Sequence, residues 1–170
     1  RANLLRLDAQ PNAVHKKLAE LERAGKLLAV ITQNIDGLHQ KAGSRTVYEL
    51  HGSVYRNRCL RCGRQYGPEV ILSVSGVPRC ADCGGVLKPE VTLYEEMLDA
   101  ATLRGAEQAW AQADLCLIGG TSLAVYPAAG FALQCGDRPC ILINRTPTAF
   151  DDLVTLAIHA DLGEVFSQIG

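Results

Sequence analysis

The sequence predicts an α/β fold, in which a doubly wound parallel (Rossmann-like) sheet carries a small inserted zinc-ribbon module. Three observations lead to this fold class. Segments with helical apolar spacing alternate with short, continuous apolar runs, which is the pattern of a parallel sheet covered by helices. Each apolar run ends in a polar loop. Two cysteine pairs interrupt the alternation between residues 55 and 89, which is typical of a metal-binding insert.

The first helix and strand precede a polar loop. Apolar residues recur at helical spacing from Pro11 to Arg23, and Gly25 follows where helices commonly end. Leu27 to Ile31 is a continuous apolar run, which predicts a strand buried on both faces. The polar residues 32–37 come directly after it and form the first candidate loop.

Two further units repeat the pattern. In the second, a helical pattern over residues 103–113 precedes the apolar run Leu115 to Ile118 and the loop 119–122. In the third, a short helix from Pro127 to Cys135 precedes a strand from Cys140 to Ile143 and another polar loop. Ligands bind beyond the carboxyl ends of such strands, so the three loops are the expected site. Ordinary turn chemistry is the alternative interpretation.

Length and composition predict one core with a small satellite module. The chain has 170 residues, and 48% of them are hydrophobic, which suffices for a single core. The expected division is residues 1–54 as the first part of a Rossmann-like domain, 55–89 as the zinc-binding insert, and 90–170 as the second part of the same domain.

Charge and hydropathy restrict the partners. The formal net charge is -1, so no basic surface favours nucleic-acid binding. No apolar run reaches the roughly 18 residues of a membrane span, and no signal peptide is evident. A soluble, cytoplasmic protein is expected, and the oligomeric state stays open. The chain opens at Arg1, so a targeting segment upstream is compatible with the sequence.

The cysteine spacing predicts a structural zinc site. Two C-x2-C pairs are separated by 17 residues, and four thiolates in a closed tetrahedral site leave no open position for catalysis. Free or redox-active thiols are the alternative. Cys116 and Cys140 lie inside apolar runs and are expected to be buried and inert. The predicted zinc ligands are Cys59, Cys62, Cys80 and Cys83.

One histidine is a candidate general base. His51 follows the first polar loop along the chain and directly precedes the insert, and a histidine titrates near neutral pH. Spacing alone favours a structural role for any single histidine. His15, on the first helix, and His159, alone near the end, are interpreted as structural.

Several motifs along the chain resemble those of the sirtuin family. The strings Thr32–His39 (TQNIDGLH) and Glu49–Ser53 (ELHGS) are similar to the sirtuin catalytic core. The four cysteines follow at sirtuin-like positions. Gly120–Leu123 with Pro127-Ala128, and then Ile143–Pro147, continue the resemblance in order across essentially the whole chain.

The resemblance implies NAD-dependent removal of an acyl group, expected to be acetyl, from protein lysine. In that chemistry the carbonyl oxygen of the acylated lysine attacks the anomeric carbon of the nicotinamide ribose, nicotinamide leaves, and an O-acyl-ADP-ribose results. His51 is implied to be the base that acts through a ribose hydroxyl. The implied cofactors are NAD as cosubstrate and structural zinc, and the implied partners are acylated-lysine proteins or peptides.

The resemblance also implies binding roles. Asn34 and Asp36 are expected to hold the nicotinamide end of NAD, with Gln33 near the adjoining ribose. The second and third loops are expected to contact ribose or phosphate oxygens and the adenosine ribose. The segment Val91–Tyr94 resembles the strand that pairs with substrate peptide, although an ordinary buried strand is the alternative. The remaining implied residues are Gly120, Thr121, Ser122 and Asn144 for NAD, and Val91, Leu93 and Tyr94 for the peptide.

Two departures from the family pattern limit these inferences. Glu95 and Glu96 follow Tyr94, where family members often carry a glycine before the glutamate, so peptide preference stays open. No glycine-rich phosphate-binding turn is present, and residues 1–7 resemble a stretch that follows it in the family. Residues 1–170 by themselves are therefore expected to bind NAD weakly and to show no turnover. Mono-ADP-ribosyl transfer, or a non-catalytic zinc-stabilised binding fragment, are the alternative functions.

Overall fold

The computed structural model describes residues 8–124, 126 and 128–169. Residues 1–7 and Pro127, which were expected to precede the first helix and to begin a later one, lie outside the described residues. Among the described helices, none is both long and apolar enough to span a membrane.

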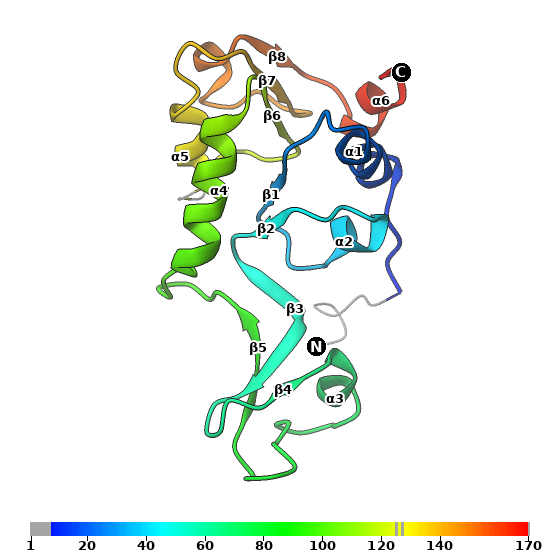
Figure 1. The fold of residues 1–170 in the computed structure, drawn as a ribbon, viewed down its shortest axis with the longest axis vertical. Helices are drawn as coiled ribbons and strands as arrows, with labels where there is room; N and C mark the ends of the chain where they lie inside the picture. Colours follow the sequence, from blue (N-terminus) through cyan, green and yellow to red (C-terminus); the bar gives the residue numbers. More distant parts are fainter. Residues whose placement is uncertain (1–7, 125, 127, 170) are drawn as a thin grey trace.

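Helices lie on both sides of short parallel strands, and a separate antiparallel module lies at one end of the molecule (Figure 1). The strands are β1 (Val30–Thr32), β2 (Val47–Glu49), β3 (Gly52–Cys59), β4 (Gln65–Tyr66), β5 (Leu87–Val91), β6 (Cys116–Gly119), β7 (Cys140–Ile143) and β8 (Leu156–Ile158). The helices are α1 (Ala13–Arg23), α2 (Leu38–Ala42), α3 (Pro68–Leu72), α4 (Ala100–Gln112), α5 (Ala128–Leu133) and α6 (Leu162–Ser167), and η1 (Asp151–Leu153) is a short 3-10 turn.

The parallel strands confirm the predicted fold class. β1 pairs with β2, and β6, β7 and β8 form a second parallel group in that order. The three strands predicted from apolar runs are β1, β6 and β7. β2 and β8 were not predicted. Each has only three residues, which is too few for the alternation of apolar and polar residues to be recognised.

Burial of these strands differs from the expectation of two covered faces. β7 is buried almost throughout, whereas β6 alternates, with Cys116 and Ile118 buried and Leu117 39% exposed. The first predicted strand is also displaced, because Leu28 is 53% exposed and pairing begins only at Val30. A continuous apolar run reports hydrophobicity but not which neighbours cover each face.

The first helix begins later than predicted. Pro11 lies before the helix, and Asn12 caps α1 because its side chain accepts a hydrogen bond from the backbone N–H of His15 at 3.1 Å. Such a cap satisfies one of the backbone donors that the first helical turn leaves without a partner. The buried residues Val14 and Ala19 then fix which side of α1 faces the core.

The inserted module is the antiparallel sheet β4-β3-β5 with α3. A small core of Cys59, Ile71, Cys80 and Leu87 holds it together. Separate apolar clusters lie between α5 and the β6–β7 pair, and between α1, α6 and β7. β3 continues directly from β2 through Leu50 and His51, so the module grows out of the parallel part of the fold beside the candidate base.

Candidate active site and zinc site

The first and second polar loops meet at the carboxyl ends of β1 and β6. The Gln33 side-chain Nε2 donates to the Thr121 hydroxyl at 3.5 Å, although the two residues are 88 positions apart. The backbone N–H of Gly120 donates to the Ile143 carbonyl oxygen at the end of β7 at 3.0 Å. Residues of the first two predicted loops and the end of the third predicted strand are therefore brought together.

His51 is held on two sides. Its Nδ1 lies 3.2 Å from the Gln33 carbonyl oxygen, and its own carbonyl oxygen accepts a hydrogen bond from the Thr92 N–H at 3.0 Å. A carbonyl oxygen can only accept, so Nδ1 carries the proton and donates. In the neutral imidazole, Nε2 is then the nitrogen with a free lone pair. This tautomer is the one a general base at Nε2 requires.

The loop that contains Asn34 and Asp36 is shaped by its own hydrogen bonds. Asp36 Oδ1 accepts from the Leu38 N–H at 3.0 Å, and the Asn34 N–H donates to the Thr32 hydroxyl at 3.0 Å. Gly37 has a positive φ of 62°, and a Cβ there would lie 3.1 Å from the Tyr55 ring. The loop is thus packed against β3, beside His51.

The buried ring of His39 lies against the partly exposed ring of His15. The ring centroids are 4.6 Å apart, and His39 Nδ1 is buried without a hydrogen-bond partner among the described residues. Burial lowers the pKa of His39 to about 4, and the neighbouring His15 contributes in the same direction. Burial also lowers the pKa of His15. His39 is therefore not a base poised near neutral pH, and the lowered pKa of His15 agrees with its structural interpretation.

Asn144 and Ser122 are not directed at His51 by any contact. Asn144 Nδ2 donates to the Thr146 carbonyl oxygen at 2.8 Å, so the carboxamide shapes its own loop. Ser122 is exposed, and the Thr121 hydroxyl accepts from the Leu123 N–H at 3.1 Å. His159 Nε2 lies 2.7 Å from Asp151 Oδ2, consistent with a structural histidine.

The four predicted zinc ligands form one cluster. Their Sγ atoms all lie within 4.8 Å of one another. Cys59 and Cys83 Sγ are 3.4 Å apart, and Cys62 and Cys80 Sγ are 3.6 Å apart. Tetrahedral Zn–S bonds of about 2.3 Å place sulfurs about 3.8 Å apart. The four thiolates therefore fit a zinc ion. The ion would join the two C-x2-C pairs and would supply no chemistry at His51.

A tyrosine that sequence reasoning missed supports this cluster. The Tyr66 hydroxyl donates to Cys80 Sγ at 3.0 Å, and it accepts from the Ala81 N–H at 3.2 Å. This hydroxyl lowers the pKa of Cys80 to about 6, which favours the thiolate that a metal binds. No motif signals the contact, because Tyr66 lies in β4 and reaches the second knuckle through tertiary packing.

The segment implied to pair with peptide lies at a sheet edge. β5 is the outer strand in the order β4-β3-β5, and it ends at Val91. Leu93 is 54% exposed and Tyr94 is fully exposed. Glu95 has a positive φ of 70°, a conformation that favours glycine. The residue that departs from the family pattern therefore adopts the backbone conformation that suits glycine.

These features define a class of protein: an α/β enzyme fold with a candidate base at the carboxyl ends of parallel strands and a four-cysteine module. The sequence profile of the Sir2 family matches residues 1–127. The NAD-dependent protein deacetylase of Cutibacterium acnes is 53% identical over 99% of this chain and 69% of its own length. That of Clostridium acetobutylicum is 48% identical, again over 99% of this chain and 69% of its length.

Solved structures of Sir2 proteins have the same fold as this chain. A complex described as Sir2 with a p53 peptide and NAD+ superposes with a TM-score of 0.90 at 42% identity, over 95% of this chain and 70% of that one. Sir2Tm bound to a propionylated peptide gives the same TM-score, identity and coverage of both chains. The chain belongs to the Sir2 family, the sirtuins.

Proposed function

We propose that this protein removes acyl groups, with acetyl as the expected one, from lysine side chains of proteins, consuming NAD and releasing nicotinamide and O-acyl-ADP-ribose. The observation that carries the proposal is the convergence at His51. Its Nδ1 contacts Gln33, and Gln33 in turn contacts Thr121. Membership in a family whose similar members are named NAD-dependent protein deacetylases supports the same reaction.

His51 acts as the general base. Hydrogen bonding of Nδ1 to a carbonyl oxygen leaves Nε2 to accept a proton from a ribose hydroxyl of the bound dinucleotide. Deprotonating that hydroxyl makes it a nucleophile toward the acyl carbon. The Gln33 carbonyl also fixes the plane of the ring, so the imidazole does not have to reorient before it accepts the proton.

The proposed cosubstrate residues come from the loops that follow β1, β6 and β7. Asn34 and Asp36 present an amide and a carboxylate, which complement the carbonyl and NH2 groups of a carboxamide such as nicotinamide. Gln33, Gly120 and Thr121 lie where the first two loops meet and suit ribose or phosphate oxygens. Ser122 and Asn144 complete the set toward the adenosine end.

The substrate is an extended, acylated-lysine peptide. The outer edge of β5 offers backbone groups for a further strand, and such addition accepts varied sequences because the hydrogen bonds come from the main chain. Val91, Leu93 and Tyr94 would flank the peptide. Complexes of Sir2 proteins with a p53 peptide and with a propionylated peptide support this class of partner.

Incubation with NAD and an acetyl-lysine peptide tests the function. The protein as expressed from its complete gene is expected to release one nicotinamide for each acetyl group lost, and mass spectrometry should detect acetyl-ADP-ribose. A parallel reaction with adenine-labelled NAD measures label retained on protein. Retained label without loss of acetyl groups would replace the proposal with ADP-ribosyl transfer. No nicotinamide release in either reaction would favour a non-catalytic binding role.

A further inference from the structure

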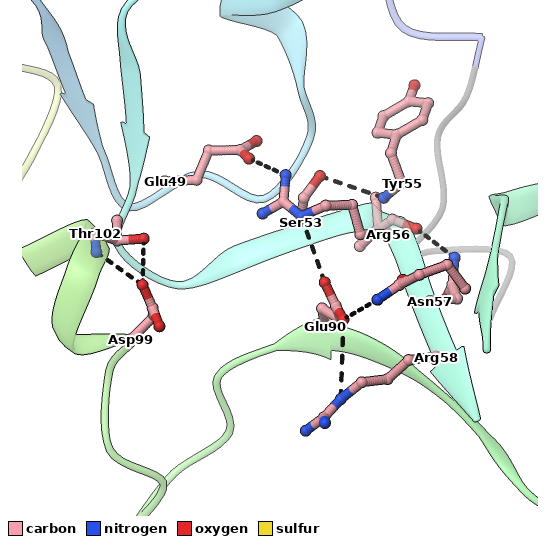
Figure 2. A network of polar contacts seen from close by, with 11 residues as sticks. Glu49, Ser53, Tyr55, Arg56, Asn57, Arg58, Glu90, Asp99 and Thr102 are labelled. Carbon is pink, nitrogen blue, oxygen red and sulfur yellow. Dashed lines mark hydrogen bonds and ion pairs between the residues drawn. The ribbon is translucent and has the colours of Figure 1, made fainter. Parts of the chain in front are cut away.

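A network of charged side chains without an assigned role joins Glu49, Arg56 and Glu90 (Figure 2). Arg56 Nη1 donates to Glu49 Oε2 at 2.7 Å, and Arg56 Nε lies 3.6 Å from Glu90 Oε2. The Glu49 side chain is only 6% exposed. A carboxylate this buried requires a partner, because removing an ion from water is costly. Arg56 supplies that partner and at the same time reaches Glu90.

The network spans an interruption in the β3–β5 ladder. The register runs from Ser53 opposite Glu90 directly to Asn57 opposite Pro89, so residues 54–56 have no partner in β5. Proline has no N–H to donate at this point. The backbone therefore does not connect the two strands across the bulge. The side-chain contacts of Arg56 connect them instead.

His51 lies next to this interruption. Its neighbour Gly52 lies so close to β5 that a Cβ would come 1.9 Å from the Glu90 carbonyl oxygen. The Thr92 N–H donates to the His51 carbonyl oxygen at 3.0 Å. A shift of β5 at Glu90 would therefore move the His51 backbone directly, and Glu49 anchors the same short segment from its other side.

We propose that Arg56 is a positioning residue for His51: by bridging Glu49 and Glu90 across the bulge, it fixes the His51 backbone and thereby the direction of Nε2. The kinetic consequence rests on the proposed function. The structural consequence, protection of the Thr92 amide that bonds to His51, can be measured without any turnover.

Arg58 offers a matched control, because it lies on the same strand, β3, as Arg56. It is 57% exposed against 50% for Arg56, and its Nε lies 3.9 Å from the same residue, Glu90. Among the described residues its ion pair is with Glu90 and not with Glu49. Arg56→Gln and Arg58→Gln remove the same charge by the same substitution. Only the first removes the bridge.

The experiment compares these two variants with the wild type by nicotinamide release, zinc content, and NMR-detected hydrogen exchange at Thr92. For Arg56→Gln we expect kcat to fall about 10-fold and Thr92 exchange to accelerate about 10-fold, while KM for NAD stays within about twofold. Arg58→Gln should match the wild type. Wild-type Thr92 protection in Arg56→Gln, or equal effects of both substitutions, would overturn the proposal.

Two further results separate positioning from other causes. If Arg56→Gln does not fold, Glu49→Gln/Arg56→Gln removes the unpaired buried charge as well. A folded, zinc-loaded double variant with slow turnover and fast Thr92 exchange supports positioning, whereas wild-type behaviour means that the pair only compensates charge. If the wild-type protein expressed from its complete gene releases no nicotinamide, the proposed function fails, and Thr92 exchange still decides whether Arg56 holds the segment.

Discussion

At the scale of single residues, His51 differs from the other histidines in what surrounds its ring. Its Nδ1 is engaged by the Gln33 carbonyl, which leaves Nε2 available. The rings of His15 and His39 lie against each other at an interplanar angle of 51°, and His159 contacts Asp151. Residue type alone does not separate these four histidines. The hydrogen bond that sets the tautomer does.

Replacing the base tests this assignment. His51→Ala is expected to lower kcat by at least about 100-fold, because a positioned general base contributes at least that factor. Affinity for NAD, measured by calorimetry, should weaken far less. His159→Ala is the control, since its imidazole contacts the Asp151 carboxylate and not the Gln33 carbonyl that engages His51. Near wild-type nicotinamide release by His51→Ala would contradict the role of His51.

At the scale of elements, the junction of β2, β3 and β5 depends on Gly52. Its φ is 75°, and the space where a side chain would begin is occupied by the Glu90 carbonyl. The main chain of β5 therefore lies against β3 at the residue after the candidate base. A glycine within the ELHGS string is thus explained by a close backbone approach.

Gly52→Ala should consequently damage both fold and activity. We expect a loss of at least about 2 kcal/mol in the free energy of unfolding, because strain at positive φ adds to the clash with backbone. Gly25→Ala is the matched control, since Gly25 has a φ of 70° but nothing within 4 Å of its Cβ position. Equal destabilisation by both substitutions in urea unfolding would show that the clash with Glu90 is relieved at little cost.

The structure of the β4-β3-β5 module is also expected to depend on its metal. We expect one zinc per chain by elemental analysis, and Cys59→Ser or Cys83→Ser should lose most of it, because either change removes one of four thiolates from a closed site. Cys135→Ala, which removes a buried thiol outside the cluster, should retain the metal. A fully folded, zinc-free wild-type protein would rule the metal site out.

At the scale of the whole molecule, stability should fall in mild acid because of His39. Its pKa of about 4 in the folded protein lies below the ordinary value of 6.5. Between these values the unfolded chain binds a proton that the folded chain does not. The contribution of neutral His39 to the free energy of unfolding is thus complete above pH 6.5. It is lost as the pH falls toward 4, which lowers that free energy by at most about 3 kcal/mol.

Unfolding free energies measured between pH 4 and pH 8 check this expectation. His39→Leu fills the buried position with an apolar side chain and removes the titrating group. The free energy of unfolding of this variant should therefore decline less steeply below pH 6.5. A pH dependence identical to that of the wild type would mean that other groups cause the decline.

Much of the fold was predictable because its signals are local in the chain. Apolar runs indicated β1, β6 and β7, helical spacing indicated α1 and α4, and the paired cysteines indicated a metal module. Helix starts and strand limits were less accurate, since α1 begins at Ala13 after the cap Asn12 and not at Pro11. The cap depends on side-chain geometry, which composition does not reveal.

The sequence by itself determined the order of chemical groups: a candidate base after the first polar loop, four thiolates at knuckle spacing, and polar residues after each strand. Only the tertiary structure decided which of them act together. It brought Gln33 to both His51 and Thr121, and joined Tyr66 to Cys80. The physical reason is that hydrogen bonds and burial act over a few ångströms in space. Residues 88 positions apart become neighbours only when parallel strands align their carboxyl ends.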